Sequence, residues 1–304
     1  MNDKIFADLH NHTTASDGDF SPAKLVRIAK EKGIKALGIT DHDTLNGLRP
    51  ALAEGKNRGV QILPGVEISV RFNRSFFTGT LHLLAYFAAR HLSNVGFCNC
   101  LNTLLSGGRG EGLVQARIEK INHCFGPQGS SPLLERDMAY EDIAAYGDNV
   151  SRRHFALALS EAFGISDKQT VNKIIGNDSP AYLPSGVSLD AVSDFIKNEP
   201  VVAVLAHPAA GSFPGEGHYR EVLPPVEIVE RLLPELLAAG VKGLEVHYPG
   251  HTSSHRALLT EWASRFDLLV TGGSDCHDAT VRPLGISGIS EAAFLKLKQA
   301  VARA

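Results

Sequence analysis

The sequence predicts an α/β fold, a (β/α) barrel interrupted by an inserted α-helical subdomain. Seven short apolar runs, each bounded by turn or helix-start signals, are spread along the 304 residues. Helical segments lie between these runs, and alternating strands and helices are typical of a parallel sheet. Five of the six intervals between successive runs fit the roughly 31 residues that one barrel unit uses.

The seven runs are predicted to be buried parallel strands, because they are nearly continuous in apolar residues rather than alternating. In chain order they are Ile5–Leu9, Ala36–Thr40, Gln61–Val66, Leu81–Phe87, Val201–Ala206, Gly243–Tyr248 and Leu268–Thr271. The interval between the fourth and fifth runs holds roughly 80–90 residues more than one ordinary unit uses. We therefore expect an insertion at that point of the barrel.

Helix signals support both parts of this organisation. A first helix is expected over Pro22–Lys32, with Ser21 as its N-cap and Gly33 as its stop. After the insertion, the barrel is expected to resume with a helix over Leu189–Lys197. Helical patterns inside the insertion cover Leu113–Phe125, Ser151–Phe163 and Ser166–Ile175. The predicted domains are a barrel of residues 1–94 and 188–304 and an inserted subdomain of residues 95–187.

The composition excludes several classes of protein. Hydrophobic residues make up 43% and charged residues 21% of the chain, which is ordinary for a globular protein and unlike disordered or collagenous chains. A net charge of −3 gives no broad basic surface, so long duplex nucleic acid is not the expected partner. The 13 histidines are the unusual feature of the composition, since histidine is the commonest metal ligand.

The cysteines and the chain start predict the compartment. The four cysteines form no C-x-x-C pair, which argues against zinc-finger and thioredoxin sites, and Cys276 is expected to be structural. No apolar run reaches the ~18 residues that a membrane span needs. The first residues carry no signal-peptide pattern, so a cytoplasmic protein with reduced thiols is expected, without a membrane partner.

Histidines and carboxylates follow almost every predicted strand. In parallel strands these positions meet at one face of a barrel, where barrel enzymes build their sites. A lone histidine at a strand end is more often structural, but the two i, i+2 pairs and the joint placement favour a metal site. The candidate ligands are His10, His12, Asp17, His42, Glu67, His82, His207, Asp275 and His277.

The motifs that carry these residues resemble one known family. H-x-H, T-D-H-D, G-x-E, H-x-L-x-Y, A-H-P and S-D-x-H occur in that order, from His10 to His277. This series resembles the PHP (polymerase and histidinol phosphatase) family of amidohydrolase-like metal enzymes. The resemblance covers about two-thirds of the chain. It implies a distorted seven-stranded (β/α) barrel, in agreement with the seven predicted strands.

The resemblance also implies two to three divalent metal ions. Mixed imidazole and carboxylate ligands suit Mn, Zn or Fe, and Mn is our first expectation. Asp8 and Asp41 are candidates for orienting the ligands. The implied groups are His10, His12, Glu67 and Asp275 for the first ion, Glu67, His82 and His207 for the second, and Asp17, His42 and His277 for the third.

A segment of the insertion is the candidate for substrate binding. Arginines at a helix start can bind phosphate, although a solvated helix start is the ordinary reading of such residues. A subgroup of the PHP family carries S/G-R-P-H followed by P-A-Y-x-P, which Ser151–His154 and Pro180–Pro184 resemble, except that Arg153 replaces the proline. The candidate substrate contacts are Arg152, Arg153, His154, Tyr182 and His218, the last in a loop over Gly211–Pro225 that is either a lid or a surface excursion.

That subgroup is similar to nucleoside 3′,5′-bisphosphate phosphatases and to 5′–3′ exoribonucleases of short RNA. The resemblance therefore implies a phosphoesterase in which a metal-bridging hydroxide removes a phosphate monoester. The expected substrate is a nucleoside 3′,5′-bisphosphate such as adenosine 3′,5′-bisphosphate, and the products are the 5′-monophosphate and phosphate. His247 is a candidate proton donor or substrate contact.

Two other functions stay open at this point. The same metals could serve a cyclic phosphate or a histidinol-type phosphate, or short RNA. A non-catalytic PHP interaction module is the alternative from a different class, but such modules often lack ligands, and every position is filled here. Neither a G-x-S-x-G elbow nor a P-loop occurs in the sequence, so serine-triad and nucleotide-triphosphate chemistry lack support.

Overall fold

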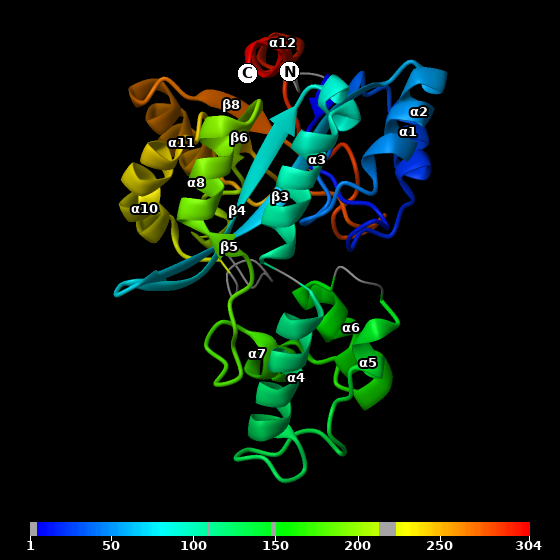
Figure 1. The fold of residues 1–304 in the computed structure, drawn as a ribbon, viewed down its shortest axis with the longest axis vertical. Helices are drawn as coiled ribbons and strands as arrows, with labels where there is room; N and C mark the ends of the chain where they lie inside the picture. The colour runs from blue at the N-terminus through cyan, green and yellow to red at the C-terminus, as the bar shows by residue number, and fades with distance from the viewer. Residues whose placement is uncertain (1–4, 109, 147–149, 213–222) are drawn as a thin grey trace.

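The computed structural model describes residues 5–108, 110–146, 150–212 and 223–304. One sheet of eight strands curves into a nearly closed barrel, with the order β1-β2-β3-β4-β6-β7-β8 and the short β5 beside β3 (Figure 1). The strands are β1 (Ala7–Asp8), β2 (Ala36–Ile39), β3 (Gln61–Arg74), β4 (Phe77–Phe87), β5 (Val187–Ser188), β6 (Val201–Leu205), β7 (Gly243–His247) and β8 (Leu269–Gly272). All seven predicted strands are present, and the predicted distorted barrel is confirmed.

The first and last strands approach each other without a full ladder. The Leu9 N–H donates to the Gly272 carbonyl at 3.2 Å, and Asn11 and Cys276 form an isolated bridge just beyond the strands. This seam brings the chain segments after β1 and β8 together. Both segments carry candidate metal ligands.

The predicted direction of the fourth strand is wrong. β4 runs antiparallel to β3 and to β6, whereas the other strand pairs are parallel. The pairing of Arg74 with Phe77 leaves a two-residue connection, and so short a turn joins only antiparallel strands. Because β4 is reversed, its first half lies toward the end of the barrel where the parallel strands finish, and His82, in the middle of β4, pairs with Ser69 of β3.

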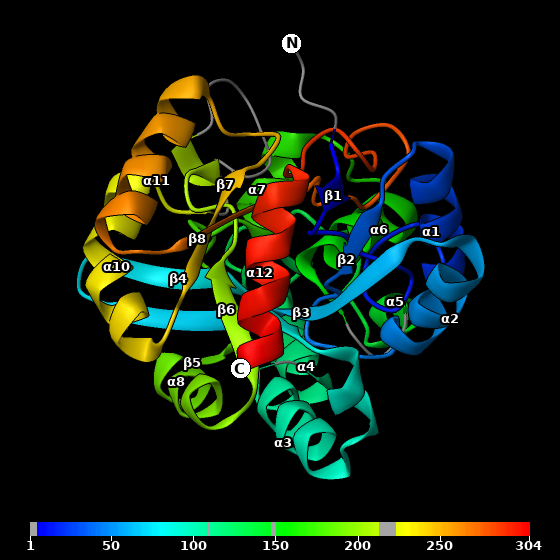
Figure 2. The ribbon, with the colours of Figure 1, turned by 90° about the horizontal axis from the view of Figure 1, so that it is seen from above.

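Helices surround the barrel and close one end of it. They are α1 (Pro22–Glu31), α2 (Leu48–Arg58), α3 (Val95–Ser106), α8 (Leu189–Asn198), α10 (Val226–Ala239), α11 (Ser253–Arg265) and α12 (Glu291–Arg303), with short 3₁₀ turns η1 (Ala89–Ser93) and η2 (Ala210–Ser212). Figure 2 shows α12 lying across the end opposite the insertion. Phe294 and Leu297 of α12 pack there on Leu9 and Tyr86, so only the other end is open for a site.

The insertion has a hydrophobic core of its own. It contains α4 (Glu111–Phe125), α5 (Glu141–Ala144), α6 (Arg152–Phe163) and α7 (Lys168–Ile175), which lie below the barrel in Figure 1. Its buried apolar residues run from Val114 to Ala181. By contrast α3, within the interval predicted as insertion, packs Phe97 and Leu101 into the barrel core. We propose that the inserted unit begins after α3.

The predicted helices are confirmed with small shifts at their ends. α1 begins at Pro22, and the Ser21 side chain accepts a hydrogen bond from Lys24 N as an N-cap. α4, α6, α7 and α8 occupy the other four predicted segments. In the described parts of the chain, no helix is both long enough and apolar enough to cross a membrane.

Candidate metal centre

The predicted ligands converge at the open end of the barrel, facing the insertion. His10 and His12 follow β1, His42 follows β2, His207 follows β6, and Asp275 and His277 follow β8. The others come from the Asp17 loop, from Glu67 within β3 and from His82 within β4. All are buried except His82, whose side chain is 20% exposed.

One group contains His10, His12, Glu67 and Asp275. Nε2 of His12 lies 3.0 Å from Glu67 Oε2 and 3.1 Å from Asp275 Oδ1. Nε2 of His10 lies 3.2 Å from the same Glu67 oxygen and 3.5 Å from the same Asp275 oxygen. Two imidazole nitrogens and two carboxylate oxygens thus face one point.

Glu67 also connects this group to a second one. Its Oε1 lies 3.0 Å from His82 Nδ1 and 3.2 Å from His207 Nε2, while Oε2 lies 3.2 Å from His42 Nδ1. His42, Glu67 and His82 form a group able to hold a metal. The structure therefore places His42 beside Glu67, in addition to the His82 and His207 that the resemblance implies there.

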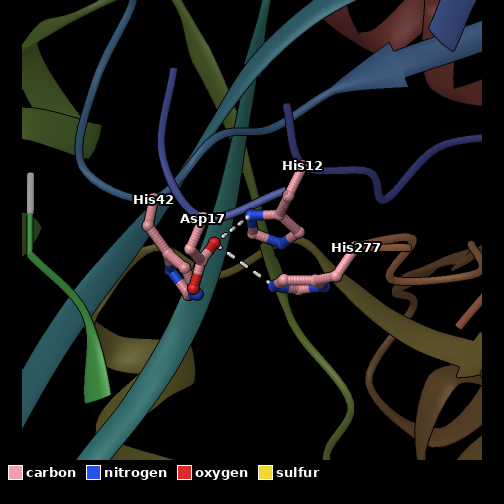
Figure 3. A group of neighbouring side chains, drawn as sticks. All are labelled: His12, Asp17, His42 and His277. Carbon is pink, nitrogen blue, oxygen red and sulfur yellow. Dashed lines mark ion pairs between the residues drawn. The ribbon is translucent and has the colours of Figure 1, made fainter. Parts of the chain in front are cut away.

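A further group contains His12, Asp17, His42 and His277 (Figure 3). Oδ1 of Asp17 points between two imidazoles, 3.3 Å from His277 Nε2 and 3.6 Å from His12 Nδ1. The rings of His12 and His277 stack with centroids 4.1 Å apart. His12 was not expected in this group, and it belongs to two groups because its two ring nitrogens face opposite sides.

The chemistry of the donor set fits divalent cations. In the described residues, the buried Asp17 Oδ1 and Glu67 Oε2 have no hydrogen-bond partner, although histidine nitrogens surround them. Burial disfavours a charged His12, but the adjacent Asp275 and Glu67 carboxylates raise the pKa of His12 to about 9. The same negative field favours a bound cation. Clustered imidazole and carboxylate ligands suit Mn, Zn or Fe.

Metal binding should stabilise the fold, because an ion that binds only the folded state shifts the unfolding equilibrium. We expect Mn²⁺ added to the metal-stripped protein to raise Tm, with about 2.7 kcal/mol from each ion at 100 times its Kd. Differential scanning calorimetry measures this rise. Ca²⁺, which prefers all-oxygen ligands, is the control and should raise Tm less. An equal rise with both ions, or none with Mn²⁺, contradicts the assignment.

Glu245 supports the centre and was not predicted as a site residue. Both of its carboxylate oxygens lie 3.1 Å from His10 Nδ1, and Oε2 accepts a hydrogen bond of 2.8 Å from the His207 backbone N–H. The carboxylate therefore fixes the ring of His10 with Nε2 toward Glu67. A charged residue inside the apolar run Gly243–Tyr248 is the sequence signal that points to it.

Substitution Glu245→Gln is expected to weaken metal binding about 10- to 100-fold, as is usual for a residue that orients a ligand. The amide keeps the shape of Glu245 but loses the charge that holds the His10 ring. Isothermal titration of Mn²⁺ into the metal-stripped variant measures the change. Glu261→Gln on α11 is the control, and equal affinities for all three proteins would refute the role.

Asp275 is held by two residues that sequence reasoning missed. The Tyr248 hydroxyl donates to Asp275 Oδ2 at 2.9 Å, and Arg282 Nη1 donates to the same oxygen at 2.9 Å. Oδ1 of Asp275 is thereby turned toward His10 and His12. The charge of Arg282 helps to hold the pKa of Asp275 well below its usual value despite burial.

Asp8 and Asp41 position loops rather than histidine rings. Asp8 accepts hydrogen bonds from Ser274 N and Oγ and from Gly285 N, and its burial raises its pKa to about 6. Asp41 accepts from Thr13 N and Oγ1 and from Ser16 Oγ. These contacts fix the segments that carry Asp275 and Asp17.

The backbone at the centre adopts a rare conformation at two candidate ligands. His207 has a φ of 31° and Asp275 a φ of 49°, in the left-handed region that non-glycine residues seldom occupy. Such residues cost of order 1–3 kcal/mol each and cluster at functional sites. The fold therefore holds both side chains in place at an energetic cost.

A cavity of about 130 Å³ lies over the cluster, between the barrel and the insertion. Its basic side chains are unusual for a chain of net negative charge. They are Arg117, Arg152, Arg153 and Arg282, beside Ser151, Tyr182 and Ser185. A pocket with metal ligands on its floor and arginines on its wall suits a ligand with more than one negative charge.

Arg152 is the arginine best placed to meet a ligand. Its Nη2 donates to Asn177 Oδ1 at 2.7 Å, and its guanidinium lies 5.5 Å from the centre of the Tyr182 ring. Its Nη1 is buried and has no hydrogen-bond partner in the described residues. Burial lowers the pKa of Arg152 from its usual value. An anion in the cavity would supply the missing partner.

The other candidate substrate contacts lie in different places. His154 is buried, and its Nδ1 accepts from the Ser151 N–H in the capping box of α6. His218, with Tyr219 and Arg220, lies outside the described residues. His247 is exposed and lines a separate hollow with Lys32, Arg256 and other residues. An irregular register between β7 and β8 separates His247 from the face of Glu245.

The sequence of this chain is similar to one family model and to several proteins of known name. Residues 8–129 match the model of the PHP domain family. A 5′-3′ exoribonuclease of Haemophilus influenzae is 28% identical over 89% of this chain and 89% of its own length. A 3′,5′-nucleoside bisphosphate phosphatase of Chromobacterium violaceum is 28% identical over 89% and 86%. A phosphoribosyl 1,2-cyclic phosphate 1,2-diphosphodiesterase of Eggerthella lenta is 28% identical over 90% and 94%.

A solved structure shares the fold over nearly the whole chain. A protein of Bifidobacterium adolescentis described as a metal-dependent phosphoesterase superposes with a TM-score of 0.74 and 26% identity, over 97% of this chain and 96% of that one. The match includes the insertion as well as the barrel. These relatives are named for activities on phosphoester bonds.

Proposed function

We propose that this chain, which belongs to the PHP family and is a phosphoesterase, removes the 3′-phosphate of a nucleoside 3′,5′-bisphosphate. Adenosine 3′,5′-bisphosphate is the expected example, and the 5′-monophosphate and phosphate are the products. The observation that carries this proposal is the buried Arg152 Nη1, which lacks a partner in the described residues and lines the same cavity as the metal-binding cluster. One phosphate can then meet the cluster while the other meets Arg152.

The cluster would hold two to three divalent ions, with Mn²⁺ as the first candidate and Zn or Fe as alternatives. Such ions lower the pKa of bound water and neutralise charge on a phosphoryl oxygen. The proposed ligands are His10, His12, Asp17, His42, Glu67, His82, His207, Asp275 and His277. Eight of these residues are buried and His82 is 20% exposed, and this low exposure to water strengthens each charge interaction with the phosphoryl group.

The wall of the cavity would select the substrate. Arg152 and Tyr182 come from the insertion, and Arg282 comes from the loop after β8. A planar guanidinium donates two parallel hydrogen bonds to phosphate, which orients it as well as binds it. A phosphate there would supply the partner that the buried Arg152 Nη1 lacks among the described residues, while Nη2 donates to the neutral amide of Asn177.

A cyclic phosphate is the second candidate substrate. The cyclic phosphodiesterase among the relatives covers the chain as fully as the bisphosphate phosphatase does. The phosphoribosyl cyclic phosphate in that relative's name carries a second phosphate, which could also meet Arg152. A cyclic phosphate without a second phosphate, such as a 2′,3′-cyclic nucleotide, would leave Arg152 without an anion. Short RNA, the third candidate, would place its 5′-phosphate in the same cavity.

Rates of product release across a panel test the proposal. Mn²⁺-loaded protein is assayed with adenosine 3′,5′-bisphosphate, adenosine 3′-monophosphate, a 2′,3′-cyclic nucleotide, histidinol phosphate and a 5′-phosphorylated tetranucleotide. The bisphosphate is expected to have the highest kcat/KM, at least about tenfold above the 3′-monophosphate, since a hydrogen bond to a charged group is worth about 1.5–3 kcal/mol. Equal values for these two substrates would overturn the role of the second phosphate.

A further inference from the structure

We propose that Arg153 is a positioning residue that fixes the Asp17 loop to the start of α6. It would thereby link the insertion to the group of His12, Asp17, His42 and His277. This inference rests on the proposed function, because it takes Asp17 as a metal ligand. It reassigns Arg153 from the substrate contact that the sequence predicts to a support for the metal centre.

The guanidinium of Arg153 reaches from the insertion to the barrel. Its Nη1 donates to the Asp17 backbone carbonyl at 2.8 Å, and its Nη2 donates to Asp19 Oδ1 at 2.9 Å. The side chain of Arg153 is 27% exposed and that of Asp19 is 56% exposed, so the ion pair is open to water, whereas the hydrogen bond to the Asp17 carbonyl is partly buried. Both contacts leave the carboxylate of Asp17 facing His12 and His277.

The opposite side of the same loop rests on the metal-binding segments. The Asp19 N–H donates to the His277 carbonyl at 2.7 Å. Gly18 packs against the backbone of His12 so closely that an added Cβ would lie 2.5 Å from the His12 carbonyl oxygen. The loop is therefore held between the barrel on one side and Arg153 on the other.

The start of α6 is rigid enough to serve as the anchor. The Ser151 side chain accepts from Arg153 N, and Ser151 N donates to His154 Nδ1, which completes a capping box. Arg152 follows the cap directly and lines the cavity. A shift of the Asp17 loop would thus be resisted by the same turn that presents Arg152.

Titration of Mn²⁺ into metal-stripped proteins tests this inference. The proteins are the wild type, Arg153→Gln, Arg153→Lys and Asp19→Ala, with calorimetry for affinity and steady-state kinetics at saturating Mn²⁺. Arg136→Gln is the matched control, because Arg136 pairs with Asp142 inside the insertion. Far-ultraviolet circular dichroism verifies that each variant is folded.

We expect Arg153→Gln and Asp19→Ala to raise the Kd of the Mn²⁺ ion that binds with the lowest affinity about 10-fold or more, as is usual for residues that support metal ligands. Arg153→Lys should restore part of that affinity, because one donor remains. At saturating Mn²⁺ the KM and kcat for the phosphorylated substrate should stay within about twofold of the wild type, whereas at Mn²⁺ concentrations below saturation kcat should fall because the site is incompletely filled.

A raised KM with unchanged Mn²⁺ affinity would overturn the inference and return Arg153 to substrate binding. Unchanged KM, kcat and Mn²⁺ affinity in Arg153→Gln would also overturn it. In either case, Mn²⁺-dependent activity of the wild type would leave the proposed function standing. A wild type that binds no Mn²⁺ would instead reject the metal assignment on which both proposals depend.

Discussion

Substitution Glu67→Gln is expected to lower kcat for phosphate release by about 1000-fold or more. The two oxygens of Glu67 contact histidines of both the group of His10 and His12 and the group of His42 and His82, and a neutral amide cannot balance two cations. A loss of about 4 kcal/mol of transition-state stabilisation corresponds to this factor. The histidines within 3.2 Å of these oxygens are His10, His12, His42, His82 and His207.

The measurement compares kcat at saturating Mn²⁺ with the Mn²⁺ content of the purified variant. Glu54→Gln is the control, because Glu54 forms a surface ion pair with Arg58 and lies away from the cluster. The control should keep wild-type activity. Retention of kcat within tenfold in Glu67→Gln would contradict the placement of the reaction at this cluster.

Substitution Arg152→Gln is expected to raise the KM for adenosine 3′,5′-bisphosphate about 10- to 100-fold, the value of one or two hydrogen bonds to a charged group. The kcat/KM for p-nitrophenyl phosphate, which has a single phosphate, should change less than about threefold. Arg152→Lys should bind the substrate at an intermediate level, because an ammonium group lacks the planar fork of guanidinium.

Arg265→Gln on α11 serves as the control for the loss of one positive charge. Equal losses of kcat/KM for both substrates in Arg152→Gln would show that Arg152 supports the fold rather than the second phosphate. Thermal unfolding of the variant separates that outcome from a binding effect. A protein that unfolds at the wild-type Tm with a raised KM supports the proposal.

The barrel could be predicted because its signals are local. Ser21 and Pro22 mark the start of α1 by capping chemistry that depends on neighbouring residues alone. The apolar run Leu81–Phe87 likewise predicts a strand, but such a run carries no information about direction. The two residues between Arg74 and Phe77 decide the direction, and they include no glycine or asparagine to mark a tight turn.

The candidate ligands could be predicted because strand ends gather at one face of a barrel. The supporting residues could not, since each depends on contacts between distant segments. Tyr248 and Arg282 meet at Asp275 from two different loops. His247 follows Glu245 by two residues, and the two would share one face in a regular strand, but the register shift between β7 and β8 interrupts the strand between them. Arg153 reaches the Asp17 loop across 136 residues of sequence.

The position of the phosphate that leaves adenosine 3′,5′-bisphosphate tests the central claim most directly. Phosphorus NMR of the reaction with Mn²⁺-loaded protein resolves adenosine 5′-monophosphate, adenosine 3′-monophosphate and inorganic phosphate. The account predicts equal amounts of the 5′-monophosphate and inorganic phosphate, and none of either when the metal is chelated. Formation of the 3′-monophosphate, or unchanged substrate in the presence of Mn²⁺, would contradict it.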